Sequence, residues 1–395
     1  MKIVRRHTVD NRIGYETLNA ILEKIGNAEE MNEIAYKGFY LPMEILLDIL
    51  SRLSLKDNVR ASSVCKAWHE AAVSVRRNSP WLVYFNISRT GHGVSFGFYD
   101  PADKIKTKSM KLPNQPFHAS LCYSKDGWLL LLVDYHGSNN RLIFFNPFTR
   151  VHMMLPSLIT IETFGADFAF SCAPTNESCV VCCISNRTPD SFLIHTWCFG
   201  AAEWVTEEFH KPSASRYRGR NNIIFSDGCF WFPDEDGLGV FHTVTRTWDT
   251  LYVPLRKLIP FLMFITEYKG NIFLVAVVSN RSQKGVVLFG LNQFGLVWEK
   301  KETFDGLSIF ISDESSIITN GLTGDMSDIV YVWDSHLIPF CLSKFSLSTG
   351  SLCTVLDGHR MSTGTSANDS EEMHFGAWIE PPQDINIYDF PIIEP

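Results

Sequence analysis

The sequence lacks the segments that export a protein or anchor it in a membrane. Its basic start, residues 1–6, is not followed by the apolar stretch of a signal peptide. The longest apolar run, residues 261–278, is interrupted by Glu267, Lys269 and Asn271, whereas a helix that spans a bilayer needs roughly 18 apolar residues. We therefore expect a protein of the cytoplasm, the nucleus or both, without membrane contact, whose ten cysteines are mostly reduced thiols.

The sequence also lacks an excess of positive charge. It contains 35 Lys and Arg against 43 Asp and Glu, a formal net charge of −8, so nucleic acid is not an expected partner. Disorder of the whole chain is excluded, because 45% of the residues are hydrophobic. Aromatic residues make up 13%, a share that favours β-sheets over helical bundles, and 395 residues suit about two domains.

Signatures of catalysis are missing too. Cys179-x-x-Cys182 is half of a zinc pattern, and because no second pair of ligands follows it, we interpret residues 179–184 as a buried strand. There is no Gly-Lys-Ser/Thr phosphate loop and no Gly-x-Ser-x-Gly nucleophile elbow. The sequence therefore predicts no catalytic residue, no metal site and no cofactor, and it directs attention to binding surfaces.

What the sequence does contain, first of all, is helical periodicity. Apolar residues recur at helical spacing in residues 15–25, which predicts a helix within an N-terminal extension of residues 1–37. A second segment begins at Leu41-Pro42, where Pro42 suits the first turn of a helix, and two further short helices precede Asn78-Ser79-Pro80. Three helices in about 40 residues cannot bury their own apolar surface, so a partner protein is expected.

Residues 39–77 resemble an F-box. The resemblance rests on Leu41-Pro42-x-Glu44-Ile45-Leu46, Ile49-Leu50-x-x-Leu53, Asp57, Arg60 and Val64-Cys65-Lys66-x-Trp68, which occur in register. It implies that this part of the chain binds a Skp-type adaptor, which accepts an apolar helix stripe in a groove, and through the adaptor a cullin. The expected adaptor-binding residues are Leu41, Pro42, Ile45, Leu46, Ile49 and Leu50. The residues expected to form the core between the helices are Leu53, Val64, Cys65 and Trp68.

From residue 80 onward, short β-rich strands alternate with Gly, Asp, Asn and Pro turns. One recurring element is a turn that leads into an apolar strand, as in Asp126-Gly127-Trp128 and Asp227-Gly228-Cys229. Another is a strand, a tight turn and a second strand, which recurs near residues 100, 146, 200, 244, 292 and 347, about 49 residues apart. This period predicts a kelch-like β-propeller of six blades, with seven as the alternative, whereas a β-sandwich would show turns without the period.

The first repeating unit, which begins at Trp81, is one strand short. The last apolar run, residues 374–379, is expected to supply that strand and close the ring, because a closed ring leaves no sheet edge. An F-box followed by such a domain resembles the plant F-box proteins that carry a KIB-type propeller. That resemblance rests on Pro80-Trp81, Phe145-Asn146-Pro147-Phe148, Asp328-Ile329-Val330-Tyr331-Val332 and Trp378-Ile379-Glu380-Pro381-Pro382.

The predicted organisation is an N-terminal helical extension over residues 1–37, an all-α F-box over 38–79, an all-β propeller over 80–382 and an acidic tail over 383–395. The resemblance implies a substrate-recognition subunit of an SCF-type ubiquitin ligase, whose F-box binds the adaptor and whose propeller binds a target protein. Two alternatives stay open, a Skp-binding scaffold without ligase activity and an enzyme housed in the propeller. Candidate target-binding loops are residues 135–140, 213–221, 233–239 and 280–285.

Overall fold

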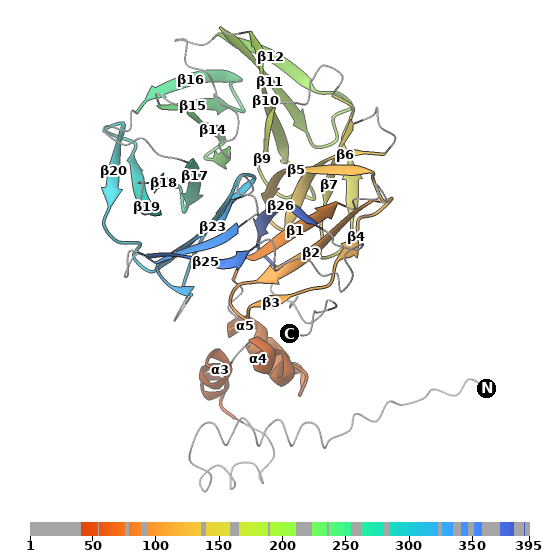
Figure 1. Cartoon of the computed structure of the whole chain (residues 1–395), viewed down its shortest axis with the longest axis vertical. Helices are drawn as coiled ribbons and strands as arrows, with labels where there is room; N and C mark the ends of the chain where they lie inside the picture. Colours follow the sequence, from red (N-terminus) through yellow and green to blue (C-terminus); the bar gives the residue numbers. More distant parts are fainter. Residues whose placement is uncertain are drawn as a thin grey trace, which may run out of the picture. The chain divides into compact units, whose positions relative to one another are not determined.

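Figure 1 shows the computed structural model of the chain. It describes residues 41–391 apart from 54, 76–78, 88–92, 136–139, 159–165, 189, 211–222, 235–236, 254–261, 280–283, 323–325, 335–340, 347–350, 358–371 and 383–390. The helix predicted within residues 1–37 lies outside the described residues, as does the acidic tail except for Pro391. The chain divides into two compact units, residues 1–78 with 382–390 and residues 79–381 with 391–395. No helix among the described residues is long and apolar enough to cross a membrane.

The first unit contains three short helices, α3 (Met43–Ser51), α4 (Leu55–Ser62) and α5 (Lys66–Val75). Pro42 immediately precedes α3, at a position where the missing N–H group of proline leaves no helical hydrogen bond unmade. The core between the helices consists of Leu46, Leu50, Ala61, Trp68, Ala71 and Ala72. Small alanine side chains on α4 and α5 let the helices approach one another around the indole of Trp68.

A buried amide joins the three helices. The side-chain nitrogen of Asn58, on α4, donates hydrogen bonds to the carbonyl oxygens of Leu50 on α3 and Ala72 on α5, at 3.3 and 3.2 Å. Asn58 is itself 3% exposed, so these bonds form away from water. The polar contact therefore fixes how the helices pack, beyond what the apolar core specifies.

The described strands of the second unit form six sheets that surround one axis as the blades of a propeller (Figure 1). Blade I contains β26 (Glu372–Ile379), β1 (Trp81–Ile87), β2 (Val94–Asp100), β3 (Ile105–Lys106) and β4 (Met110–Lys111). Blade II contains β5 (His118–Lys125), β6 (Trp128–Asp134), β7 (Asn140–Phe145) and β8 (His152–Met154). Blade III contains β9 (Asp167–Phe170), β10 (Val180–Thr188), β11 (Ser191–Cys198) and β12 (Val205–His210).

Three further blades complete the ring, and the six-blade prediction is confirmed. Blade IV contains β13 (Ile224–Ser226), β14 (Cys229–Asp234), β15 (Gly237–His242) and β16 (Thr247–Tyr252). Blade V contains β17 (Leu262–Tyr268), β18 (Asn271–Ser279), β19 (Lys284–Asn292) and β20 (Val297–Lys301). Blade VI contains β21 (Leu307–Ser312), β22 (Ser315–Asn320), β23 (Ile329–Asp334), β24 (Cys341–Ser346) and β25 (Ser351–Asp357).

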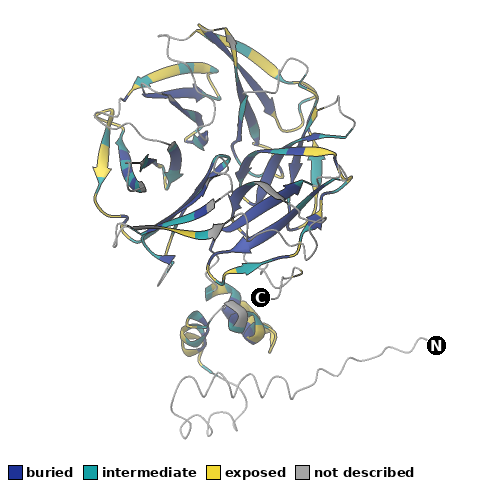
Figure 2. Cartoon of the chain, viewed as in Figure 1, coloured by how far each residue is buried: buried dark blue, intermediate teal, exposed yellow. Residues whose placement is uncertain are grey.

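The core of the propeller lies between neighbouring blades. Figure 2 shows buried residues on the inner strands and exposed residues on outermost strands such as β12, β16 and β20. Aromatic side chains fill the gaps between blades. Phe144 of blade II contacts Phe170 of blade III edge-to-face, and Phe192 of blade III contacts Trp248 of blade IV. The aromatic richness of the sequence is therefore used in packing sheet against sheet.

Tight turns confirm the predicted turn–strand elements. Asp126-Gly127, Asp227-Gly228 and Lys269-Gly270 each have two successive positive φ angles, between 49° and 78°. Two positive φ angles are the mark of a type I′ hairpin turn, which matches the twist of the strands it joins. These turns link the first and second strands of blades II, IV and V. Since the blades are antiparallel, the turns between third and fourth strands lie on the same face of the propeller, which we call the mouth face.

The C-terminal strand closes the ring as predicted. β26 pairs antiparallel with β1, with Trp81 opposite Ile379 and Leu82 opposite Trp378. The rings of Phe85 and Phe375 stack with centroids 4.8 Å apart. Blade I is thus assembled from strands that are almost 300 residues apart in the sequence, which leaves β1 without a free edge.

Blade VI departs from the four-strand pattern. β22 is its innermost strand, followed by β21, and β21 pairs with β23 in parallel, with Phe310 opposite Tyr331. The turn of the β21–β22 hairpin contains Glu314, whose carbonyl oxygen accepts a hydrogen bond of 3.1 Å from the backbone N–H group of Ser124 on β5. The hairpin therefore reaches past blade I to blade II, in the middle of the ring.

The cysteine-rich segment also agrees with its prediction. Cys182 and Cys183 are fully buried on β10, and Cys179 is buried just before that strand begins. Burial raises the pKa of the Cys183 thiol well above its ordinary value. These thiols therefore serve as small apolar side chains in the packing between blades.

Candidate binding surfaces

Helix α3 presents apolar side chains on its surface. Met43 and Ile45 are 47% and 49% exposed, Pro42 is exposed, and Ile49 lies one turn after Ile45 and is half-buried. These neighbouring apolar side chains make the helix a candidate interaction surface. We call Pro42, Met43, Ile45 and Ile49 the α3 surface.

The predicted adaptor-binding residues divide into two groups. Pro42, Ile45 and Ile49 belong to the α3 surface, and Leu41 beside them is half-buried. In contrast, Leu46 and Leu50 are only 3% and 1% exposed, because they point into the core with Trp68. Leu46 and Leu50 therefore expose almost no surface in the chain alone, and their contact with an adaptor stays a prediction.

The predicted core residues need a correction. Trp68 is buried in the core and Leu53 packs against it, as expected. Val64 and Cys65, however, are exposed. The reason is local, because α4 ends at Ser62 and α5 begins at Lys66, so that both residues fall in the turn between the helices.

A cavity of about 320 Å³ opens on the mouth face of the propeller, where the inner strands end. We call it the mouth pocket. Its lining includes the ends of β5, β13, β17 and β26 and the middle of β22. Five charged side chains contribute to this lining, namely Lys125, Asp126, Glu267, Lys269 and Glu380.

The two lysines of the mouth pocket are held by aromatic neighbours. Lys125 Nζ donates a hydrogen bond of 3.4 Å to the carbonyl oxygen of Phe225 and lies 5.7 Å from the centre of its ring. Lys269 Nζ lies 5.1 Å from the ring centre of Tyr268. Each ammonium group is thus attracted to the face of an aromatic ring.

The carboxylates outnumber these cations. Asp126 accepts a hydrogen bond of 3.2 Å from the backbone N–H group of Ala173, and Glu267 accepts one of 2.6 Å from Gly270. Burial, and then the neighbouring Asp126, raise the pKa of Glu380, although Lys125 acts in the opposite direction. A cation that entered the pocket would favour the ionised form of Glu380 and be attracted to it. The mouth pocket therefore suits a basic side chain.

The floor of the mouth pocket is the β21–β22 hairpin. Ser315 Oγ accepts a hydrogen bond of 2.8 Å from the backbone N–H group of Trp378, and Ser316 Oγ donates one of 3.0 Å to the carbonyl oxygen of Ile265. Burial, and then Asp313, raise the pKa of Glu314 well above its ordinary value. The hairpin is bonded to blades I, II and V and gives the pocket a rigid base.

The described strand ends that flank the candidate loops from the sequence lie on the opposite side of the propeller. Residues 135–140, 233–239 and 280–285 join second to third strands, and residues 213–221 join blade III to blade IV. In an antiparallel blade both kinds of connection leave the face that lies away from the mouth pocket. Most residues of these loops lie outside the described part of the chain, so the structure leaves their proposed role untested.

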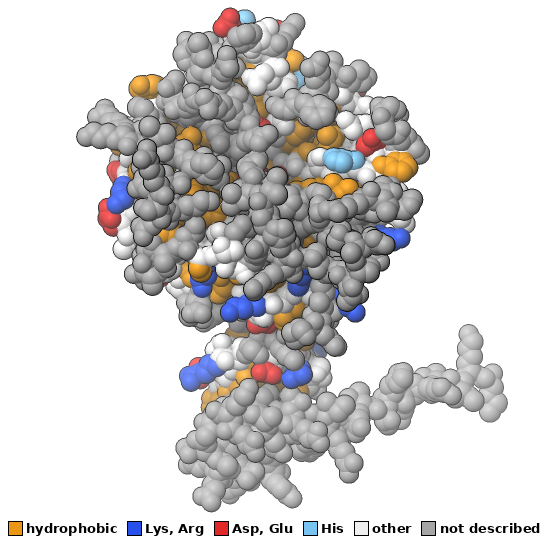
Figure 3. Space-filling model, viewed as in Figure 1, with side chains coloured by type: hydrophobic (Ala, Val, Ile, Leu, Met, Phe, Trp, Pro, Cys, Tyr) orange, Lys and Arg blue, Asp and Glu red, His pale blue; other side chains and the backbone are white. Residues whose placement is uncertain are grey.

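Charged side chains of the described residues are dispersed on the propeller face that Figure 3 shows. In Figure 3, basic and acidic residues both occur toward the edge of the visible face, with apolar side chains between them. The mouth pocket could not be located from the sequence, because its residues come from four strand ends and the middle of a fifth strand and share no motif. Only the positions of the turns that carry Asp126 and Lys269 could be read from the sequence.

Family models match both units. Residues 39–77 match the model described as F-box-like, and residues 98–369 match the model described as KIB1-4 beta-propeller. Both resemblances predicted from the sequence are confirmed by these matches.

Three proteins of Arabidopsis thaliana are similar to most of this chain. F-box protein At1g49360 is 41% identical over 396 residues, which cover 96% of this chain and 80% of that protein. F-box/kelch-repeat protein At3g18720 is 37% identical in a region that covers 80% of this chain and 85% of that protein. F-box/kelch-repeat protein At1g57790 is 36% identical, with 70% of this chain and 76% of that protein covered.

Proposed function

This chain belongs to the F-box proteins with a KIB1-4 β-propeller, and from that membership we propose that it is the substrate-recognition subunit of an SCF-type ubiquitin ligase in the cytoplasm or nucleus. Its F-box binds a Skp-type adaptor, which connects it to a cullin. Its propeller binds the protein that is to be ubiquitylated. The chain itself supplies no catalytic group for ubiquitin transfer, and the catalytic effect comes from holding the target beside the ubiquitin-carrying enzyme.

The α3 surface is the observation that carries this proposal. An F-box whose own core is filled by Leu46, Leu50 and Trp68 still exposes Met43 and Ile45. Covering such side chains with an adaptor groove removes apolar area from water, at roughly 25 cal/mol per Å². The turn residues Val64 and Cys65 add exposed apolar atoms to the same unit.

The mouth pocket is the proposed anchor for the target. It lies at the centre of one propeller face, its floor is bonded to three blades, and its carboxylates outnumber its lysines. A Lys or Arg side chain of the target would enter between Glu380 and Glu267, with the ring of Tyr268 beside it. The rim of the mouth face then supplies the remaining contact area.

Reconstitution tests this proposal. The full chain is combined with a Skp adaptor, a cullin, a RING subunit and charged ubiquitin carrier, and a protein captured by the propeller in cells is added. Ubiquitylation of that protein that depends on this chain supports the ligase role. Stable binding of the adaptor without ubiquitylation would identify a scaffold instead, and turnover of a substrate without adaptor would identify an enzyme.

A further inference from the structure

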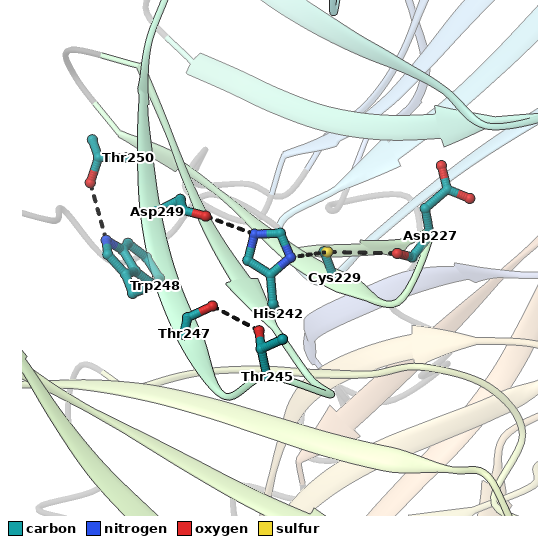
Figure 4. A network of polar contacts seen from close by, with 8 residues as sticks. All are labelled: Asp227, Cys229, His242, Thr245, Thr247, Trp248, Asp249 and Thr250. Carbon is teal, nitrogen blue, oxygen red and sulfur yellow. Dashed lines mark hydrogen bonds and ion pairs between the residues drawn. The ribbon is translucent and has the colours of Figure 1, made fainter.

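Blade IV contains a thiol, an imidazole and a carboxylate joined in a row (Figure 4). Cys229 Sγ lies 3.1 Å from Nδ1 of His242, and Nε2 of the same imidazole lies 2.9 Å from Oδ2 of Asp249. We call Cys229, His242 and Asp249 the thiol relay. Neither the adaptor site nor the mouth pocket includes any of these residues.

The strand register builds the thiol relay. Cys229 begins β14 and stands directly opposite His242, the last residue of β15. Asp249 lies on β16 opposite Val240, two residues before His242, so all three side chains share one face of the sheet. In the turn that joins β15 to β16, Thr245 and Thr247 share a hydrogen bond of 2.8 Å (Figure 4). The relay therefore stands on paired strands and a bonded turn.

The proton positions follow from the partners. A carboxylate can only accept, so the Nε2 atom of His242 carries the proton that is donated to Asp249. In the neutral ring, Nδ1 is then the lone-pair atom, and it faces the thiol of Cys229. Because Sγ and the carboxylate lie at opposite nitrogens of one ring, the three groups do not converge on a common point as metal ligands do.

The thiol is protonated at rest. Burial raises the pKa of Cys229, and the carboxylates of Asp227 and Asp249 raise it further. A thiolate, the form that reacts with electrophiles, must therefore be produced in place, by transfer of the proton to Nδ1 of His242. Cys229 is 8% exposed, so an oxidant that reaches it must be small.

We propose that Cys229 is a site of reversible oxidation by small hydroperoxides. As sulfur attacks the peroxide, His242 Nδ1 takes the thiol proton, a sulfur–oxygen bond forms and the oxygen–oxygen bond breaks. The proton passes from His242 to the departing oxygen, which leaves as water or an alcohol. Sulfur loses two electrons to the peroxide and becomes a sulfenic acid, which a small thiol can convert into a mixed disulfide with release of water.

Oxidation of Cys229 would regulate the propeller, although Cys229 itself takes no part in binding the target. Cys229 immediately follows the Asp227-Gly228 turn of the mouth face, and its oxidation places a polar oxygen where the thiol now meets the imidazole. The pairing of β14 with β15 at Cys229 and His242 is the contact that the added atom disturbs. Oxidation is thus expected to alter the mouth face beside the mouth pocket.

The chain provides its own comparison set for a test. Cys65, Cys198 and Cys353 are exposed thiols, and among the described residues none of them makes a hydrogen bond to a histidine. The full chain bound to its adaptor is treated with hydrogen peroxide in the presence of dimedone, and the labelling rate of each cysteine is measured by mass spectrometry. We expect Cys229 to be labelled faster than the three exposed thiols, although it is the least accessible of the four.

Variants of the relay identify the cause. His242→Asn removes the proton acceptor and should slow labelling of Cys229 by about 100-fold, the lower end of what a positioned base contributes. Asp249→Asn keeps the imidazole but loses the partner that fixes its tautomer, and should give an intermediate rate. Thr245→Val is the matched control, because it removes a bond in the same turn without touching the relay, and its labelling rate should equal that of the wild type.

Two results would overturn the proposal. Labelling of Cys229 at or below the rate of the exposed cysteines would show that the relay confers no reactivity. Unchanged labelling in both His242→Asn and Asp249→Asn would show that the imidazole has no part in it. Thermal melting of each variant accompanies the measurement, and a variant that unfolds is replaced by the other of the pair.

Discussion

Ser124 Oγ donates a hydrogen bond of 2.9 Å to the carbonyl oxygen of Trp378, a residue 254 positions later in the chain. The backbone N–H group of Trp378 is bonded in turn to Ser315 of the β21–β22 hairpin, and its indole Nε1 donates to the carbonyl oxygen of Ile311 at 3.0 Å. Trp378 therefore joins blades I, II and VI, in addition to its strand pairing with β1. The ring is closed by this residue as much as by the ladder of β26.

Removal of β26 should unfold the propeller at a clearly lower temperature. A chain that ends at Met361 loses the buried side chains of Ala377, Trp378 and Ile379 and leaves β1 as a free edge. Loss of a buried Trp alone costs about 3–5 kcal/mol. Differential scanning calorimetry provides the measurement, and a chain that ends at Pro382, which keeps β26, is the control. Identical melting of both truncated chains would contradict ring closure by β26.

Acidic substitutions on the α3 surface should strongly weaken adaptor binding. In the double variant Ile45→Asp and Ile49→Asp, two charges would enter an apolar contact, which should weaken binding by roughly 100-fold or more. Titration of the adaptor by calorimetry measures the effect. Val297→Asp is a matched control, because Val297 is 48% exposed, like Ile45, but belongs to β20 of the propeller. Wild-type affinity in the double variant would refute the assignment of the α3 surface.

Asn58→Leu should loosen the helical unit. The substitution fills a similar volume but removes both hydrogen bonds to the carbonyl oxygens of Leu50 and Ala72, at a cost of about 1–3 kcal/mol. Amide hydrogen exchange of α5 is expected to become faster by the corresponding factor. Ser63→Ala, which removes an exposed local bond to Arg60, should leave exchange unchanged. Unaltered protection of α5 in Asn58→Leu would mean that the apolar core alone specifies the packing.

Asp100 should make the stability of the propeller depend on pH. Burial raises the pKa of Asp100 from 3.8 to about 6, although Ser79 and Ala102 donate hydrogen bonds to the same oxygen, Oδ1. The folded protein therefore binds more protons than the unfolded chain between these values. The contribution of Asp100 to the free energy of unfolding then falls by about 3 kcal/mol as pH rises from about 4 to about 6, and it stays lost above that.

The variant Asp100→Asn tests this prediction. Its amide retains the acceptor that Ser79 and Ala102 use and adds no charge. Melting temperatures at pH 4 and pH 7 are expected to differ less in Asp100→Asn than in the wild type, and the variant should be the more stable protein at pH 7. Asp190→Asn on the exposed β10–β11 turn is the control. A variant that is less stable than wild type at pH 7 would contradict the raised pKa.

Glu380→Gln should weaken target binding without affecting adaptor binding. The substitution preserves the shape of the mouth pocket and removes one carboxylate, which should lower the affinity for a basic side chain by about tenfold. Quantitative mass spectrometry of proteins retained by the chain under proteasome inhibition measures the loss. Glu203→Gln changes an exposed carboxylate at the edge of blade III and provides the control. If the Glu380→Gln variant retained the same proteins as the wild type, the mouth pocket would not be the site that binds the target.

The repeat period of the sequence was enough to predict the propeller and its number of blades. The repeat near 49 residues and turns such as Asp126-Gly127 and Asp227-Gly228 are local signals, so the blades and their hairpins could be located from sequence. The strand at residues 374–379 was visible because an apolar run remained without a partner. The repeat, the turn dipeptides and the apolar run are all local features of the sequence, and the structure agrees with each of them.

Features that depend on contacts between distant parts of the chain could not be predicted from the sequence. The β21–β22 hairpin turns through Asp313 and Glu314 without glycine, and its parallel pairing with β23 has no local signature. The exposure of Val64 and Cys65 depends on where α4 ends, which helical periodicity does not fix. The mouth pocket and the thiol relay arise only when separate strands come together in space.

The position of β26 also determines the order in which the two units can fold during synthesis. During synthesis the F-box leaves the ribosome first, whereas blade I cannot form until Ile379 has been added. Every nascent chain therefore passes through a stage with its adaptor-binding helices complete and its receptor ring open at β1. A chain cut or terminated before residue 372 is expected to stay in that stage, with the proposed adaptor-binding helices intact, no closed ring to receive a target, and a strand edge exposed to its neighbours.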